Sequence, residues 1–225
     1  MFIGHWAPAL VAATHPRAPG LGTLFIAGQL VDWAFFGFVL GGVEHMRLAP
    51  GTSAMNPMDL YHMPYTHSLL GSVLWAGGFA LILWWWRRDR TTALIGGGVV
   101  LSHWFLDLLV HIPDLTLWGA EPKLGLGLWD HPAIAMPLEL ALTFGALIWY
   151  LICTRATRAS ARMAVGTLAL ILLTVQVVNW FGPEPTAPDA SAAIAVFGTF
   201  TFITLLAYWT GTTRTIIRSA AAQRG

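Results

Sequence analysis

Six apolar stretches, each close to the length needed to cross a bilayer as a helix, constrain the fold of this 225-residue chain more than any other feature. A transmembrane helix needs about 20 consecutive, mostly apolar residues, and 56% of this sequence is hydrophobic while only 10% is charged. Such a composition excludes an ordinary soluble domain. We predict an all-α polytopic bundle of about six transmembrane helices, forming one integral membrane domain over residues 1–225, with spans at residues 21–43, 67–86, 93–112, 132–153, 163–182 and 191–211.

The first twenty residues precede the first span and contain a short apolar run of their own. They lack the basic start of a secretory signal peptide, and His5 and Pro8 interrupt the apolar run. We therefore expect this segment to stay on the protein, with a short half-helix from Trp6 to Thr14 inserted into the bundle and a turn over residues 15–20.

The basic residues indicate which side each loop faces. Six spans place four groups of basic residues at one end of the bundle, and the positive-inside rule assigns that end, together with the C-terminus, to the cytoplasm. Of the acidic residues only Asp89 lies there, so the chemistry is expected in the outer half. Because the basic residues flank spans and form no continuous face, no nucleic-acid partner is expected. The four groups are Arg17; Arg87, Arg88 and Arg90; Arg155, Arg158 and Arg162; and Arg214, Arg218 and Arg224.

Four ionisable residues lie inside predicted spans, namely Asp32, His103, Asp107 and Glu139. An aspartate at mid-helix costs about 2.5 to 3.5 kcal/mol on insertion scales, and no Lys or Arg lies in a span to neutralise the acids. An interhelical hydrogen bond explains any one of these residues alone. For all four together, the compensators are shared protons, water or a bound cation. Since Cys153 is the only cysteine, such a cation would have to be held by nitrogen and oxygen atoms.

The spacing in the third span places three of these groups on one side of a helix. His103, Asp107 and His111 recur every four residues, close to the 3.6 residues of one helical turn. His103 and His111 are about 12 Å apart along the axis, too far to bind one ion together. His103 with Asp107 is therefore the expected pair, and Asp107 with His111 serves a second ion or a water-filled mouth.

Depth arithmetic brings further residues to the same level of the bundle. At about 1.5 Å per residue from the cytoplasmic end, His5 lies at about 15 Å, Asp32 at about 18 Å, His103 at about 16 Å and Asp107 at about 22 Å. His67 begins the second span from the outer side. We therefore predict His5, Asp32, His67, His103 and Asp107 as the metal ligands.

Residues close to the outer loops are further candidates for this site. His62, His111 and His131 are additional candidate ligands, and Glu139 or Asp130 is the candidate general base. Asp130 has a structural alternative as the N-cap of the fourth span, because Pro132 is suited to a first helical position.

Together these residues resemble a family of bacterial membrane-bound metal-dependent hydrolases, also described as LexA-binding, inner-membrane-associated hydrolases. The resemblance covers residues 4–118 and implies a metal-dependent hydrolase of the bacterial inner membrane. It departs from the family's H-R-G-x-T-H-S at Met63 and Pro64. Four pieces match in order: Gly4-His5; Asp32; His62 with Thr66-His67-Ser68-Leu69-Leu70; and Leu101-Ser102-His103 with Asp107.

The order of the ligands is also similar to that of zinc-dependent phospholipase C and related single-strand nucleases, which are helical enzymes with clustered zinc ions. This resemblance implies one or two zinc ions and gives His131 and Glu139 as late ligands. Those two residues stand eight positions apart in this chain, where the enzymes have four.

The predicted function is hydrolysis by a water molecule that a divalent metal activates, with Zn²⁺ first and manganese or iron as alternatives. The expected substrate is amphipathic or lipid-like, such as a phosphodiester, an ester or an amide, and the expected partner is membrane lipid. Two alternatives stay open. One is a membrane amidase resembling the alkaline ceramidases, whose late H-x3-H pair is missing here. The other is a transporter with an intramembrane His and Asp site.

Overall fold

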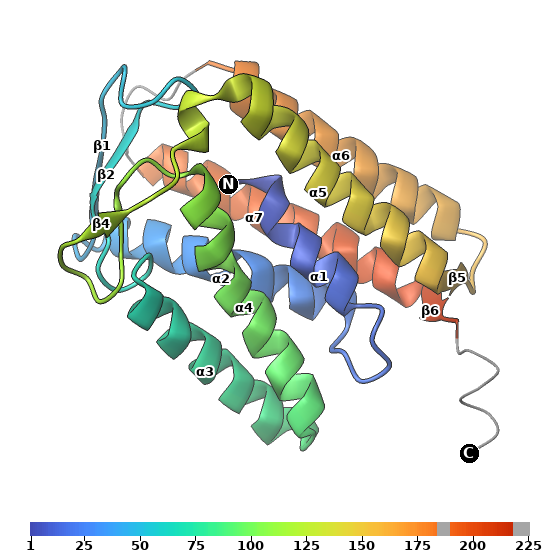
Figure 1. Cartoon of the computed structure of the whole chain (residues 1–225). Helices are drawn as coiled ribbons and strands as arrows, with labels where there is room; N and C mark the ends of the chain where they lie inside the picture. Colours follow the sequence, from blue (N-terminus) through green and yellow to red (C-terminus); the bar gives the residue numbers. More distant parts are fainter. Residues whose placement is uncertain (184–189, 218–225) are drawn as a thin grey trace.

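The computed structural model describes residues 1–183 and 190–217, and within them the chain folds as an all-α bundle (Figure 1). Six of the described helices are long and apolar enough to cross a membrane. Their ends lie within three residues of the predicted spans, which confirms the fold class. These helices are α2 (Leu21–Leu40), α3 (Leu69–Arg87), α4 (Arg90–Val110), α5 (Pro132–Cys153), α6 (Ala161–Phe181) and α7 (Ala190–Thr212).

The expected N-terminal half-helix is present and lies inside the bundle. It starts as a 3-10 turn, η1 (Ile3–Trp6), and continues as α1 (Ala7–Ala12). α1 packs against α5 and α2 (Figure 1). The side chains of Ile3, Trp6 and Leu10 are fully buried, and the indole of Trp6 donates a hydrogen bond to the carbonyl of Phe25 at 3.0 Å. The segment is therefore part of the core.

Most of the long helices pack as neighbouring pairs. α3 and α4 form an antiparallel pair, α4 and α7 both pack against α2, and α6 packs against α7 (Figure 1). Short elements occupy the two ends of the bundle. The end opposite the basic turns carries an antiparallel hairpin of β1 (His45–Leu48) and β2 (Met58–His62), the pair β3 (Leu115–Thr116) and β4 (Lys123–Leu124), and the 3-10 turn η2 (Leu128–Asp130). We call this the hairpin end.

The other end carries the tight turns between helices, and its helix caps follow from the sequence. The side chain of Asp89 caps α4 by accepting hydrogen bonds from the backbone N–H groups of Thr91 and Thr92. The hydroxyl of Thr92, which also donates to this carboxylate, holds the pKa of Asp89 below its ordinary value. Asp89 thus stays ionised where a negative charge favours the helix start.

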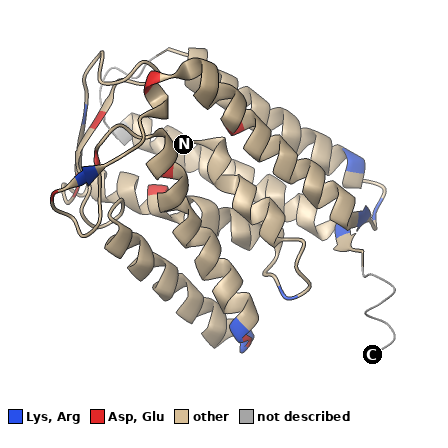
Figure 2. Cartoon of the chain, viewed as in Figure 1, with Lys and Arg blue, Asp and Glu red and all other residues tan. Residues whose placement is uncertain are grey.

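Charge is distributed as the sequence predicts. Basic residues gather at the end that holds the turns α1–α2, α3–α4 and α5–α6 and the C-terminal end of α7, which we call the basic end (Figure 2). Two contacts hold these turns together. The hydroxyl of Thr92 lies 2.6 Å from the carbonyl of Arg17 and shares its single proton between this oxygen and Asp89, and β5 (Thr154–Ala156) pairs with β6 (Arg214–Ile216). Arg218 and Arg224 lie outside the described residues, and the assignment of the basic end to the cytoplasm stays a prediction.

Candidate metal centre

The structure brings all five predicted ligands into one buried cluster in the half of the bundle nearer the hairpin end. They come from η1, α2, the segment before α3, and α4. Two overlapping groups each place their ligand atoms within 4.8 Å of one another. One group is His5, His103 and Asp107, and the other is Asp32, His67 and His103.

Asp107 lies at the centre of this cluster and is 1% exposed. Its Oδ1 is 3.0 Å from Nε2 of His5 and 3.4 Å from Nε2 of His111. Its Oδ2 is 3.1 Å from Nε2 of His103 and 3.7 Å from Nε2 of His67. The amino group of Met1 also contacts Oδ1, at 2.7 Å. Each carboxylate oxygen thus faces a different pair of imidazoles.

Asp32 approaches the same cluster from α2. Its Oδ1 is 3.4 Å from Nε2 of His67 and 3.5 Å from Nε2 of His103. The Asp32 carboxylate is 16% exposed, whereas the imidazoles of His67 and His103 are almost fully buried. Asp32 therefore lies on the side of the cluster that faces a neighbouring cavity.

Three of the histidines have their second ring nitrogen engaged, which fixes the direction of the first. Nδ1 of His103 lies 2.9 Å from the carbonyl of Gly28. A carbonyl only accepts, so Nδ1 of His103 carries the proton and Nε2 presents a lone pair to the cluster. Nδ1 of His111 lies 2.8 Å from Oδ1 of Asp114 in the same way. Such contacts orient metal-binding histidines and fix their tautomer.

His67 is oriented through a relay that the sequence did not reveal. Nδ1 of His67 lies 2.8 Å from the hydroxyl of Thr66, which donates to Oε2 of Glu44 at 2.6 Å. Oε1 of Glu44 accepts the backbone N–H groups of Tyr65 and Thr66 at 2.8 and 2.9 Å. Glu44 is fully buried. Because Thr66 gives its proton to Glu44, its oxygen accepts from Nδ1 of His67, and Nε2 of His67 is left unprotonated.

Several buried atoms of the cluster have no hydrogen-bond partner among the described residues. They include Nε2 of His5, Nε2 of His103 and Oδ2 of Asp107. These atoms lie near one another without the geometry of a hydrogen bond. An unsatisfied polar atom in a buried site is costly, and a cation placed among the lone pairs would satisfy all three. The donor set therefore fits a metal ion.

Close packing of η1 against α2 brings His5 to this cluster. A side chain at Gly28 would place its Cβ 2.6 Å from the backbone oxygen of His5. Only a glycine lets the two backbones approach so closely. The same residue supplies the carbonyl that orients His103, so Gly28 positions two of the candidate ligands.

Glu139, the candidate general base, lies beside the N-terminal segment and binds its backbone. Its Oε1 accepts the backbone N–H groups of Phe2 and Gly4 at 2.5 and 3.1 Å. Its Oε2 accepts from the amide of Gln176 at 3.0 Å, and Gln176 in turn accepts the N–H of Ile3. With both oxygens occupied, Glu139 anchors the segment that carries His5.

Three other candidates lie away from the cluster, at the hairpin end. His62 is an exposed residue of β2 whose ring stacks on that of His45 at 5.5 Å. Asp130 and His131 are exposed; Asp130 accepts the N–H of Ala54 at 3.1 Å, and His131 is the N-cap of α5. The family resemblance suggested His62, the order of ligands suggested His131, and Asp130 was a candidate from its place before the fourth span; all three are exposed at the hairpin end. His111, by contrast, does join the cluster.

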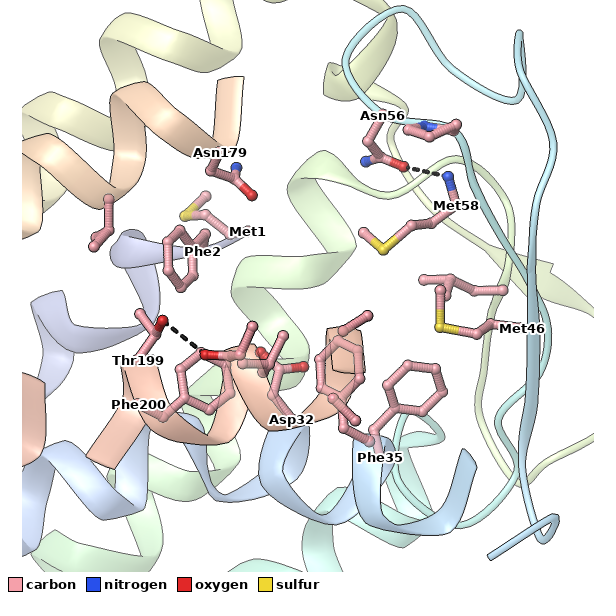
Figure 3. A pocket seen from close by; sticks show the side chains of 18 of the residues that line it. Met1, Phe2, Asp32, Phe35, Met46, Asn56, Met58, Asn179, Thr199 and Phe200 are labelled. Atoms are coloured by element: carbon pink, nitrogen blue, oxygen red, sulfur yellow. Dashed lines mark hydrogen bonds between the residues drawn. The ribbon is translucent and has the colours of Figure 1, made fainter. Parts of the chain in front are cut away.

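A cavity of about 520 Å³ adjoins the cluster (Figure 3). Asp32, His67, Asp107 and His111 form one part of its lining. The remainder comes from the hairpin end and from α2, α6 and α7, and most of it is apolar. The cluster is therefore accessible to a molecule of moderate size.

Comparison of the chain with protein-family models, with curated proteins and with solved structures gives no match.

Proposed function

We propose that this chain is a metal-dependent hydrolase that acts within the membrane, with Zn²⁺ as its metal. The observation that carries the proposal is the shared orientation of His67, His103 and His111. Each has its Nδ1 engaged by a separate partner and its Nε2 directed at a buried carboxylate. Packing alone gives no reason for three independently oriented imidazoles to converge.

The donor set offers room for one or two ions. Asp32, His67, His103 and Oδ2 of Asp107 form one set of nitrogen and oxygen ligands. His5, His103 and Asp107 form a second, which shares His103 and Asp107 with the first. Mixed imidazole and carboxylate ligands without thiolate suit zinc, with manganese and iron as alternatives. An ion in such a site lowers the pKa of bound water to about 7 and polarises the bond to be cleaved.

Residues around the cluster would bind the metal ion and orient its ligands, and the adjoining cavity would give the substrate access. Asp107 and Asp32 would compensate the positive charge of the ion, and the relay of Glu44 and Thr66 would keep His67 in its ligating tautomer. The adjoining cavity admits an amphipathic or lipid-like substrate. The bond that is hydrolysed is a phosphodiester, an ester or an amide. A bacterial inner membrane, with the basic end in the cytoplasm, is the proposed location.

Metal analysis of the purified protein tests the proposal. We expect zinc at close to stoichiometric amounts after purification in detergent and dialysis against zinc. His103→Ala and Asp107→Ala should lose it, whereas His62→Ala, which removes an exposed histidine, should keep it. Size-exclusion chromatography and circular dichroism show whether each variant is folded.

The outcomes separate the alternatives. Zinc retained by both cluster variants, or absent from the folded wild-type protein, contradicts the proposed site. Zinc binding with ion flux in liposomes, but without hydrolysis of lipid esters, amides or phosphodiesters, favours the transporter.

A further inference from the structure

The cavity beside the cluster has a polar floor and apolar walls. The floor is formed by Asp32, Asp107 and the two histidines that line the cavity. Across the cavity, Met46 and Met58 face Met1 and Phe2 (Figure 3). Two asparagines lie elsewhere on the lining (Figure 3); they are Asn56 and Asn179.

In the part of the chain that the structure describes, the walls carry no basic side chain, and the amino group of Met1, which also lines the cavity, is paired with Asp107. Among the described residues that line the cavity there is no Lys or Arg. The hairpin contributes three methionines, Met46, Met55 and Met58. Methionine is flexible and polarisable, and it is common on surfaces that adapt to apolar ligands of varied shape. Most of the lining thus suits hydrocarbon, and the groups suited to polar chemistry lie mainly at the floor.

The cavity lies between helices that face lipid on their other sides. Its α6 wall includes Val175, and its α7 wall includes Val196. Neighbours of these residues on the same helices lie outside the cavity lining and are exposed, Val177 at 44% and Ile194 at 68%. Each of the two helices therefore presents some side chains to the cavity and others to the surface of the bundle.

The size of the cavity limits its occupant. Interiors of folded proteins are close-packed, and pockets of about 300 to 1,000 Å³ are typical of bound organic ligands. At about 30 Å³ for a group of the size of a water molecule, 520 Å³ holds about 17 such groups. That is enough for most of one long alkyl chain and too little for two.

We propose that this cavity is the subsite for one hydrocarbon chain of the substrate, and that the substrate is a long-chain acyl ester or amide whose carbonyl lies at the floor beside Asp32. This assignment rests on the proposed hydrolase function, which it narrows to one class of substrate. The apolar walls hold the chain, and the donor atoms at the floor face the bond to be cleaved. The walls then determine which acyl-chain lengths the cavity accepts, independently of the metal.

Photo-crosslinking tests the assignment in the full-length protein. The probe is a monoacylglycerol with a diazirine on a palmitoyl chain, added to protein in phosphatidylcholine nanodiscs. We expect labelled peptides from the cavity walls in α6, α7 and the hairpin. Val175→Trp and Val196→Trp fill the cavity and should reduce this labelling about tenfold or more, the range expected when an apolar pocket no longer fits its ligand.

Matched variants on the same helices control for general effects of tryptophan. Val177→Trp and Ile194→Trp add the same side chain on the faces turned away from the cavity and should leave wall labelling unchanged. A probe with a hexanoyl chain should label the walls weakly in every variant. If a tryptophan variant is unfolded on size exclusion, Val196→Phe replaces it.

The results distinguish this assignment from the hydrolase proposal. Wall labelling that is unaffected by both filling variants overturns the chain subsite, even where zinc binds. Labelling that is blocked by filling, in a protein that binds no zinc, supports the chain subsite and contradicts the hydrolase. Zinc content should be the same in the filling variants and in the wild-type protein, because none of the four positions is a candidate ligand.

Discussion

His5 and His103 lie face to face, with ring centroids 3.6 Å apart and ring planes only 4° apart. One belongs to the N-terminal turn and the other to α4. Two positively charged rings in this arrangement would repel each other, so the stack favours a neutral imidazole on at least one of the two residues. Neutral imidazoles are also the form that binds metal. The N-terminal segment therefore contributes a side chain, His5, to the cluster itself.

The relay from Glu44 to His67 predicts an unusual effect of a nearly isosteric change. In Glu44→Gln, an amide at the position of Oε2 would donate to Thr66, whose proton would then turn toward Nδ1 of His67. His67 would be driven to the tautomer that is protonated at Nε2, which cannot bind a metal. We expect zinc affinity to fall about 10- to 100-fold, the usual range for partners that orient a ligand. Competition with a zinc chelator measures it.

A double-mutant cycle controls for unrelated damage at the same place. Thr66→Val removes the relay by another route, so its effect and that of Glu44→Gln should be strongly non-additive. Effects on zinc affinity that simply add would show that Glu44 does not act through Thr66.

Gly28 should tolerate no side chain, because the backbone of His5 occupies the space. Gly28→Ala is expected to displace η1, to destabilise the protein by about 1 to 3 kcal/mol, as overpacking does, and to weaken zinc binding. Gly37→Ala, in the same helix, is the matched control. Its added methyl would meet no atom of a neighbouring segment within 4 Å. It should be neutral or stabilising by up to about 1 kcal/mol. Thermal unfolding in detergent measures both variants, and equal effects would contradict the close approach.

The pairing of Glu139 with Gln176 predicts rescue by exchange. Glu139→Gln leaves an acceptor for Phe2 and Gly4 but sets two amide N–H groups against each other, at a cost of about 1 to 3 kcal/mol. Adding Gln176→Glu restores an acceptor opposite the new amide and should recover most of the stability, as measured by thermal unfolding. A general base would behave otherwise: Glu139→Gln would keep its stability and lose turnover, and the exchange would not restore turnover.

Asp89 predicts a pH dependence of helix stability at the basic end. Because its pKa is lowered in the folded protein, its contribution is complete above the ordinary aspartate pKa. It is lost as the pH falls below about 4 and passes through the lowered value. Asp89→Asn keeps the cap without a titrating group, so the difference in stability between wild type and variant should shrink on acidification. Melting temperatures between neutral pH and pH 3 measure this difference, and a constant difference would exclude the cap as its source.

Periodicity and depth predicted the parts of the site that helices position. A fixed rise per residue was enough to bring His5, Asp32, His103 and Asp107 to one level, because helices inserted from the same end keep their registers. The 3.6-residue repeat likewise placed His111 beside Asp107. These predictions needed no knowledge of which helices are neighbours.

The loops could not be predicted in this way. Glu44 and Asp114 orient two of the histidines, yet no spacing in the sequence connects Glu44 with His67 across the β1–β2 hairpin. His62 was expected at the site from the family resemblance and His131 from the order of ligands, but the hairpin and the turn before α5 expose them. A buried carboxylate such as Glu139 signals that it needs a partner, and only the packing shows that the partner is the N-terminal backbone.

The anchoring of the N-terminal turn imposes an order on the biogenesis of the protein. Gly4 is held by a residue 135 positions later, and Ile3 by one 173 positions later. Translation proceeds from the N-terminal side of a chain, so η1 is made before α5 and α6, which supply both of these anchors. The hydrogen bonds that fix the backbone on either side of His5 can therefore form only after α5 and α6 have been synthesised.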